Sequence, residues 1–161
     1  MRVLLQRVSR ARVRVGGEIT GEIGAGYVAL IGVARGDTQA DMDYLCRKIA
    51  ALRLWPDEAG KMNRSLLEAV AAPAVLAISQ FTLLADTRRG LRPSFDAAAP
   101  PEEARPLYEG LIAQLRTAGV NVATGVFQAD MDVELVNQGP VTVLLDSRDG
   151  VAEKTQITGR V

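Results

Sequence analysis

Histidine is absent from the 161 residues of this chain. Its absence excludes Ser-His-Asp and Cys-His catalysis, histidine-ligated metal sites and the usual general base near neutral pH. An enzyme with this composition has to use carboxylates, lysines, hydroxyl groups, backbone dipoles or a group on the substrate itself.

Cysteine, long apolar runs and net charge are also scarce. The single cysteine, Cys46, cannot form an internal disulfide, which fits a reducing compartment. No apolar run approaches the roughly 18 residues of a membrane span, and the one near the N-terminus is too short for a signal peptide. We therefore expect a cytoplasmic protein. A net charge of zero and a pI near 6.3 do not indicate the large basic surface of a nonspecific nucleic-acid binder.

The composition is that of a globular protein, with 48% hydrophobic and 24% charged residues. The chain length suits one domain, and neither a repeat nor a linker divides it. The last residues are polar and have no apolar period. We therefore predict one domain over residues 1–146, followed by a loosely held polar tail over 147–161.

The apolar pattern of the domain predicts strands with few helices. Residues 2–15 and 27–33 are typical of strands, with a Gly-Gly hairpin signal after the first. Apolar residues at helical spacing predict one helix that starts near Thr38 and ends before Pro56, and another from Pro100 to Gly119. The other expectations are a loop over 56–73 with at most a helical turn at 65–70, a buried strand over 75–84, an exposed loop over 86–101, and short strands from 120 to 145. This order predicts an α/β fold: an antiparallel or mixed, barrel-like β-sheet covered on one side by two main helices.

Arg7 breaks the alternation of the first strand because it falls on the apolar face. An unpaired guanidinium is costly to bury. Either the strand is interrupted near Ser9, or Arg7 has partners such as backbone carbonyls or a carboxylate. A structural and a functional pairing are equally consistent with the pattern.

Residues 131–146 form two strand-like runs separated by Asn-Gln-Gly-Pro. Pro140 has no amide hydrogen and Gly139 has no side chain, so this dipeptide can present bare backbone carbonyls. The pattern by itself favours a turn or an edge interruption. A site built from backbone atoms is the alternative.

Polar side chains also interrupt the buried strand over 75–84. Ser79, Gln80 and Thr82 must bond to neighbouring backbone or face a cleft. A covalent mechanism is disfavoured, because neither a histidine nor an adjacent lysine is available to activate Ser79 or Thr82.

The loop TRRGLR at residues 87–92 is either a solvated basic loop or a phosphate-binding one. Four aspartates, Asp41, Asp43, Asp130 and Asp132, are spaced like exposed positions. They do not predict a metal cluster, and we expect neither a metal nor a cofactor.

Four motifs occur in order: LLQRV at residues 4–8, SQFTLLADT at 79–87, RGLRPSF at 89–95 and FQADMDVELVNQGPVT at 127–142. Each is weak alone, but together they closely resemble the D-aminoacyl-tRNA deacylase family over about residues 1–145. Gln138 stands where that family often has an acidic residue, at a position that varies.

The resemblance implies a homodimer with active sites at the subunit interface. The pocket for the tRNA 3′ end would be formed by the catalytic set Ser79, Gln80, Phe81 and Thr82, with backbone amides near Phe81 and Thr82 as oxyanion donors. Gly139-Pro140 would be a cis dipeptide inserted from the partner subunit, and its carbonyls would leave no room for an L side chain. The other substrate-binding residues would be Met131, Asn137 and Arg7, of which Arg7 would hold the dipeptide in place.

The resemblance further implies hydrolysis of the ester between the terminal adenosine of tRNA and a D-amino acid, or glycine mischarged on alanine tRNA, with rejection of L-aminoacyl-tRNA. The substrate's own 2′-hydroxyl would help to activate water, which removes the need for a side-chain base. Two rivals are a hydrolase of free D-amino-acid esters and a noncatalytic nucleic-acid-binding module. The second would use the arginines Arg10, Arg12, Arg14, Arg88, Arg89 and Arg92.

Overall fold

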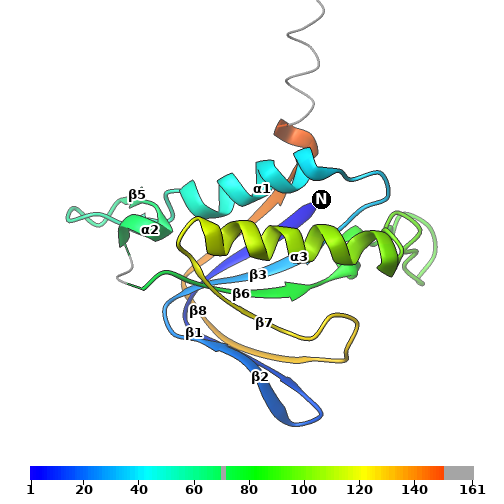
Figure 1. Ribbon diagram of the computed structural model, residues 1–161, viewed down its shortest axis with the longest axis horizontal. Helices are drawn as coiled ribbons and strands as arrows, with labels where there is room; N and C mark the ends of the chain where they lie inside the picture. The colour runs from blue at the N-terminus through cyan, green and yellow to red at the C-terminus, as the bar shows by residue number, and fades with distance from the viewer. Residues whose placement is uncertain (70–71, 151–161) are drawn as a thin grey trace, which may run out of the picture.

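The computed structural model describes residues 1–69 and 72–150. Within them one sheet runs in the order β2-β1-β3-β6-β7, and β8 pairs with β1 as well (Figure 1). The strands are β1 (Arg2–Val15), β2 (Glu18–Ile23), β3 (Gly26–Gly32), β6 (Ala74–Ser79), β7 (Asn121–Thr124) and β8 (Asp132–Asp146). The first half of β1 pairs with β3, its second half pairs with β2, and β8 follows nearly its whole length.

The sheet is mixed and curls toward closure. β1 is antiparallel to β2, β3 and β8, whereas β6 is parallel to both β3 and β7. At the far end of the order, β2 approaches β7 so closely that a Cβ added to Gly21 would lie 2.5 Å from the carbonyl oxygen of Thr124. Glycine is needed at this position for that close approach. The expected mixed, barrel-like sheet is confirmed.

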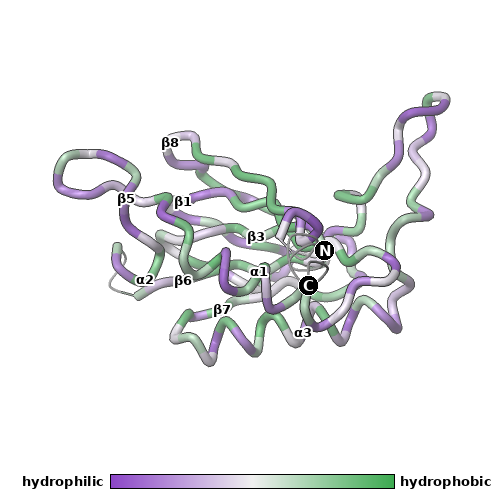
Figure 2. The backbone as a smooth tube through the Cα atoms, turned by 90° about the horizontal axis from the view of Figure 1, so that it is seen from above, coloured by the Kyte–Doolittle hydropathy of each residue, from purple (hydrophilic) through white to green (hydrophobic). Residues whose placement is uncertain are grey.

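Two long helices, α1 (Gln39–Ala51) and α3 (Pro101–Thr117), lie side by side across one face of the sheet, as the sequence predicted (Figure 1). Figure 2 shows polar and apolar residues alternating along α3, which is the pattern of a helix with one buried face. None of the helices in the described residues is long and apolar enough to span a membrane.

Two apolar clusters hold the layers together. One lies between the sheet and the helices and contains Leu45, Cys46 and Leu111. The other lies inside the curled sheet around Val13 and Leu76. Cys46 is buried in the first cluster and packs there as a core residue.

The strand expected over 75–84 was wrong in its second half. β6 ends at Ser79, and a 3-10 helix, η1 (Phe81–Leu84), follows. The amide of Gln80 still donates to Ile31 O at 2.7 Å, but β3 ends one residue later, so no ladder partner remains. Leu84 is buried and Phe81 is exposed, a division that a tight helical turn permits and a buried strand does not.

The loop expected over 56–73 contains secondary structure that its sequence did not show. β4 (Trp55–Pro56) and β5 (Met62–Arg64) form a small hairpin, and α2 (Leu66–Ala69) confirms the predicted helical turn. Asp57 closes the hairpin by accepting the amides of Ala59 and Lys61 at 2.9 and 3.0 Å. The hairpin is stabilised by these short-range bonds, so it lacks the long apolar alternation by which an ordinary strand pair is predicted.

Ser147 and Asp41 are buried, contrary to a loose tail that begins at residue 147 and to an exposed Asp41. The Met1 ammonium group donates to Ser147 Oγ at 2.7 Å, and Ser147 Oγ donates to Asp41 Oδ1 at 2.6 Å. The hydroxyl is satisfied between opposite charges, which makes its burial favourable. Residues 151–161 of the expected tail lie outside the described residues.

Candidate functional site

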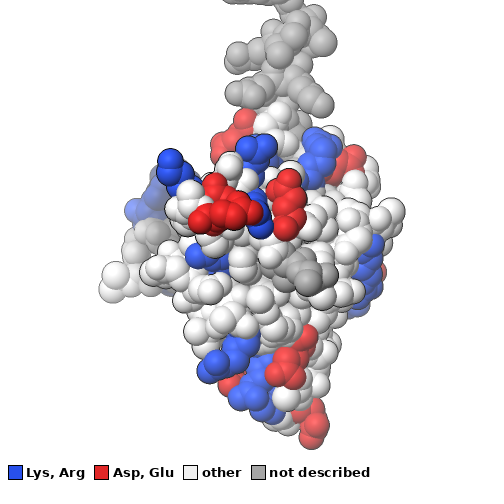
Figure 3. All heavy atoms as spheres, turned by 90° about the vertical axis from the view of Figure 1, so that its left-hand side faces the viewer, with Lys and Arg blue, Asp and Glu red and all other residues white. Residues whose placement is uncertain are grey.

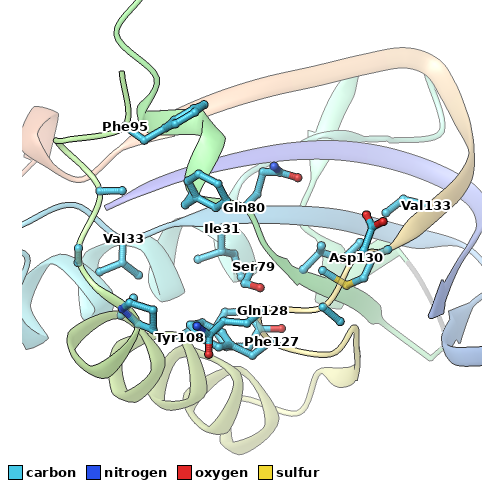
Figure 4. Close-up of a pocket in the computed structure, with 18 residues that line it drawn as sticks. Ile31, Val33, Ser79, Gln80, Phe95, Tyr108, Phe127, Gln128, Asp130 and Val133 are labelled. Carbon is cyan, nitrogen blue, oxygen red and sulfur yellow. The ribbon is translucent and has the colours of Figure 1, made fainter. Parts of the chain in front are cut away.

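A pocket of about 640 Å³ opens at the carboxyl ends of β3 and β6, beside the start of α3 (Figure 4). Its walls come mainly from six segments: the end of β3, the end of β6, η1, the chain before α3, α3 itself and the connection from β7 to β8. The lining residues that matter below are Ile31, Ser79, Gln80, Phe81, Phe95, Ala104, Tyr108, Phe127, Gln128, Asp130 and Met131. This volume is in the usual range for a small-molecule site.

Two aromatic rings form the outer rim of the pocket. Phe81 and Phe95 meet edge to face, with centroids 5.0 Å apart, and their exposed fractions are 57% and 37%. A large exposed ring beside a cavity is uncommon in a folded protein and suits stacking on a ligand.

The inner wall is apolar and offers few ionisable groups. Tyr108 donates its hydroxyl to Ala77 O at 2.9 Å, and burial raises the pKa of Tyr108 to about 12. The centroid of its ring lies 5.6 Å from that of Phe127. The guanidinium of Arg105 lies over the Phe127 ring, with Cζ 4.6 Å from the centroid. Tyr108 therefore shapes the pocket and is not a base near neutral pH.

Ser79 and Gln80 supply polar atoms at the centre and edge of the pocket (Figure 4). The side-chain amide of Gln80 donates to the hydroxyl of Thr82. Thr82 itself does not line the pocket. The first amides of η1, those of Phe81 and Thr82, make no hydrogen bond to other described residues, as expected at the start of a helix.

Gln128 and Asp130 also line the pocket, although the sequence did not single them out. Gln128 has a φ of +67°, a conformation that residues other than glycine rarely adopt. Both lie in the FQADM segment that contributed to the resemblance. The resemblance of that segment could have pointed to them. The apolar pattern could not, because exposed polar residues in a connection between strands show no periodicity.

The second candidate region is a bulge in β8, residues 138–141. Gln6 of β1 pairs with Thr142 and Val8 pairs with Asn137, so four residues of β8 stand opposite Arg7 alone. Within the bulge the Gly139-Pro140 peptide bond is cis, as the resemblance implied, and Gly139 has a φ of +123°. Both residues are exposed. β8 thus continues through the dipeptide, which is neither a turn nor the end of a strand.

Side chains on either side fix the shape of this bulge. Asn137 Oδ1 accepts the amide of Val141 at 3.1 Å, and Asn137 Nδ2 donates to Thr142 Oγ1 at 2.8 Å. These two bonds close the base of the bulge in the way that an asparagine closes an Asx turn.

Arg7 lies under the bulge and is paired with backbone carbonyls. Its Nε donates to Gln138 O at 3.3 Å, and its Nη1 donates to Leu54 O. The guanidinium also lies over the ring of Trp55, 5.4 Å from the centroid. This confirms the expected carbonyl partners of Arg7. β1 is also irregular at Ser9, because its register with β8 shifts between Val8 and Arg10 and leaves Ser9 without a partner on β8.

The pocket and the bulge lie at opposite ends of β3. Arg7 pairs with Tyr27 at the start of β3, whereas Ser79 pairs with Ile31 near its end. Four residues of strand separate these positions, about 13 Å. Of the predicted site residues, Ser79, Gln80, Phe81 and Met131 line the pocket; Thr82 lies next to it; Arg7, Asn137, Gly139 and Pro140 gather at the bulge.

The surface along β8 is unusually apolar for an edge strand. Val133, Val136 and Leu144 are 36%, 40% and 58% exposed. Figure 3 shows a broad uncharged band between groups of charged side chains on one side of the molecule. An exposed apolar edge strand is a common place for another chain to associate.

Known proteins of similar sequence match nearly the whole chain. The family model described as D-Tyr-tRNA(Tyr) deacylase matches residues 4–146. A D-aminoacyl-tRNA deacylase of Symbiobacterium thermophilum is 60% identical over 91% of this chain and 96% of its own length. One of Thermus aquaticus is 55% identical over 92% of this chain and 97% of its own.

Solved structures show the same agreement in fold. A c-Myc DNA Unwinding Element Binding Protein superposes with a TM-score of 0.84 at 38% identity, covering 91% of this chain and 98% of that one. A probable eukaryotic D-amino acid tRNA deacylase superposes with a TM-score of 0.71 at 13% identity, over 90% and 98%, and at that identity supports the fold alone.

Proposed function

The chain belongs to the D-Tyr-tRNA(Tyr) deacylase family, and from this premise we propose that it hydrolyses the ester bond of D-aminoacyl-tRNA to release free amino acid and tRNA. Its relatives are deacylases, so the chain is a hydrolase. The observation that carries the proposal is the pocket beside β6, because Ser79, Gln80 and Phe81 of the SQFT segment line it and its volume suits an aminoacylated nucleoside.

The terminal adenosine enters this pocket. Phe81 and Phe95 offer ring faces for stacking, and Phe127 and Met131 provide an apolar wall. Stacking of a base on aromatic side chains is the usual way in which proteins hold a single-stranded RNA end. Ser79 donates or accepts a hydrogen bond near the ester.

Catalysis uses the backbone and the substrate. Two ionisable side chains line the pocket: Tyr108, whose pKa burial raises to about 12, and the carboxylate of Asp130. Cys46 lies in the core, where burial raises the pKa of its thiol. In the mechanism that the resemblance implies, the substrate's 2′-hydroxyl assists the attacking water, and the amides of Phe81 and Thr82 stabilise the developing oxyanion.

Thr82 is not a nucleophile in this mechanism. Its hydroxyl oxygen accepts a hydrogen bond from the side-chain amide of Gln80, and Thr82 does not line the pocket. Thr82→Ala is expected to retain appreciable activity in a single-turnover assay. A trapped aminoacyl-Thr82 adduct would instead require a covalent mechanism.

Chirality is read by the bulge of a second copy of the chain. Gly139 and Pro140 present carbonyls rather than side chains, and these carbonyls exclude an L side chain from the pocket of the partner. The exposed apolar edge of β8 supports a homodimer, and the distance between bulge and pocket on one chain supports action across its interface. A pocket that excludes L side chains also admits glycine, so glycyl-tRNA mischarged on alanine tRNA is a second substrate. The tRNA substrate places the protein in the cytoplasm.

Matched D- and L-tyrosyl-tRNA test the proposal directly. The expected result is rapid release of D-tyrosine and negligible release of L-tyrosine. Equal rates on both substrates, or no reaction on either, would contradict it. D-Tyrosine ethyl ester serves as a control: turnover as fast as that of the tRNA substrate would favour a hydrolase of free esters.

A nucleic-acid-binding module without catalysis is the rival, suggested by the name of the DNA-binding relative. It predicts salt-sensitive binding whether or not the tRNA is aminoacylated. The arginines on β1 are a weak basis for it. Arg12 and Arg14 both bond to Glu134, at 2.6 and 3.1 Å, and these bonds lower the pKa of Glu134.

A further inference from the structure

A basic loop, residues 86–94, extends from the rim of the pocket. Backbone bonds between Asp86 and Ser94, at 2.8 and 2.9 Å, close its base. The next residue, Phe95, is the rim residue that contacts Phe81. In Figure 2 two loops stand out from the body of the molecule, and the one on the right is this loop. The pocket and the loop are therefore continuous.

The tip of the basic loop carries uncompensated positive charge. Arg88 is neutralised, because its Nε and Nη2 donate to the carboxylate of Asp86 at 2.9 and 2.6 Å. Arg89 and Arg92 make no hydrogen bond or ion pair with the described residues. The loop has no other acidic side chain. Two free guanidinium groups thus flank the tip, unlike Arg12 and Arg14, which share one carboxylate.

Between these arginines the backbone makes a tight turn that displays an apolar side chain. Gly90 has a φ of +66°, which glycine adopts without strain. Leu91 is 104% exposed, the most exposed large apolar residue of the described chain. Such a tip, apolar between two cations, suits a partner that offers both anionic groups and flat apolar surface.

We propose that Arg89 and Arg92 bind backbone phosphates of the tRNA 3′ strand immediately upstream of the adenosine held in the pocket, with Leu91 against a base or ribose. This rests on the proposed function, because the pocket determines where the RNA strand emerges. Three or four residues lead from the base of the loop to its tip, a reach of about 10–13 Å. Guanidinium forks match phosphate oxygens in geometry as well as charge.

The double variant Arg89→Ser/Arg92→Ser tests the assignment. We expect kcat/KM on D-tyrosyl-tRNA to fall about tenfold, mainly through KM, because two phosphate contacts are lost. On 3′-O-D-tyrosyl-adenosine, which has no phosphate, the variant should equal the wild type. The control is Arg47→Ser/Lys48→Ser, which removes the same charge from exposed positions on α1. An equal loss in the control, or on the adenosine ester, would overturn the proposal.

Binding of uncharged tRNA gives a readout that does not depend on deacylation. In fluorescence anisotropy over a range of salt concentrations, the slope of log K against log[salt] should become shallower by roughly 1.4, at about 0.7 per single-strand phosphate. An unchanged slope, or the same loss of affinity for duplex DNA, would overturn the assignment. A wild type that binds tRNA but cleaves no D-aminoacyl ester would contradict the proposed function and leave the loop assignment to be decided by this slope.

Discussion

The pocket beside β6 and the bulge of β8 differ in what shapes them: side chains shape the pocket, and backbone shapes the bulge. The pocket is a cavity shaped by side chains from six segments, and any of its walls can change by substitution. The bulge presents backbone, and its shape depends on a few bonds made by Arg7 and Asn137. A single substitution can alter a surface made of side chains. A surface made of backbone carbonyls changes only when the residues that hold the backbone in place, here Arg7 and Asn137, are changed.

The two regions are also complementary in position. Each lacks what the other has: the pocket has aromatic walls, and the bulge has an exposed Gly-Pro dipeptide. They stand at opposite ends of β3 on one chain. In the homodimer that we propose, the pocket of one copy would meet the bulge of the other at the exposed edge of β8.

The largest effect is expected from Gly139→Ala. A Cβ at this position would lie 2.7 Å from Val141 Cγ2 and 3.0 Å from Arg7 Nη2, on a residue with a φ of +123°. The carbonyls have to move, and a shift of about 1 Å can cost about a hundredfold in rate. D-Tyrosyl-tRNA hydrolysis measures this. Gly16→Ala is the control, because Gly16 has a φ of +58° in the β1–β2 hairpin and nothing near its Cβ. Equal losses in both variants would mean that the bulge has no special role.

A smaller loss is expected when the pocket is filled. Ala104 of α3 lines the pocket, so Ala104→Leu should raise KM for D-tyrosyl-tRNA about tenfold, equivalent to about 1.4 kcal/mol of binding. Ala113→Leu makes the same change at an exposed position of the same helix and should leave KM unchanged. Steady-state kinetics distinguish the two, and an unaltered KM in Ala104→Leu would remove the pocket from the site.

Mixing these two variants tests whether the regions act across an interface. If Gly139→Ala and Ala104→Leu chains form mixed dimers at random, about a quarter of the sites combine an intact pocket with an intact bulge. Co-expression should therefore restore activity to about that level. Absence of any recovery would favour a site confined to one chain.

Arg7→Lys should have an effect of about the same size as Ala104→Leu. A lysine cannot donate to the carbonyls of Gln138 and Leu54 together while it lies over Trp55. We expect activity on D-tyrosyl-tRNA to fall about tenfold and the preference for D over L to fall with it, because the bulge loosens. Arg10→Lys, exposed on the same strand, is the control. A purely structural role for Arg7 would lower stability without changing the D-to-L ratio.

The smallest effect on catalysis is expected at Ser147, which lies outside the bulge and does not line the pocket. Ser147→Ala removes both bonds of a buried hydroxyl and should cost about 1–3 kcal/mol in the free energy of unfolding, with kcat unchanged. Urea denaturation measures the loss. A parallel loss of kcat would show that the other variants also act through stability.

The pH dependence of the Ser147 effect follows from Asp41. Burial alone would raise the pKa of Asp41, but hydrogen bonds from Ser147 and Thr38 outweigh burial and lower it. The stability it contributes is complete above the ordinary aspartate pKa of about 4 and is lost as the pH falls through the lower folded value. The difference in stability between wild type and Ser147→Ala should therefore begin to shrink below about pH 4 and be smallest below the lowered folded pKa of Asp41. A constant difference would mean that Asp41 is not the partner that matters.

Periodicity was sufficient to predict the long elements because their apolar faces repeat. β1, β3, α1 and α3 were all predicted, and the fold class followed from them. Periodicity did not predict the short elements, whose structure depends on a few local contacts. η1 forms because β3 ends at Gly32, and the β4–β5 hairpin forms because Asp57 caps it. Neither cause leaves a period in the sequence.

The residues of the candidate site were likewise predicted only in part. Polar interruptions marked Ser79 and Gln80, and a missing amide marked Pro140, because each breaks a local rule that can be seen without a structure. Gln128 and Asp130 break none and were missed. Arg7 was recognised as unusual, but its partners lie 47 and 131 residues away and could not be identified from spacing.

The sequence by itself determined which chemistry this protein can use, because an absent histidine and a Gly-Pro pair within a strand pattern are properties of composition and order. Tertiary structure alone decided where that chemistry lies. Distances between segments remote in sequence depend on how the sheet curls, and the register between β1, β3 and β6 puts the pocket and the bulge at opposite ends of one strand.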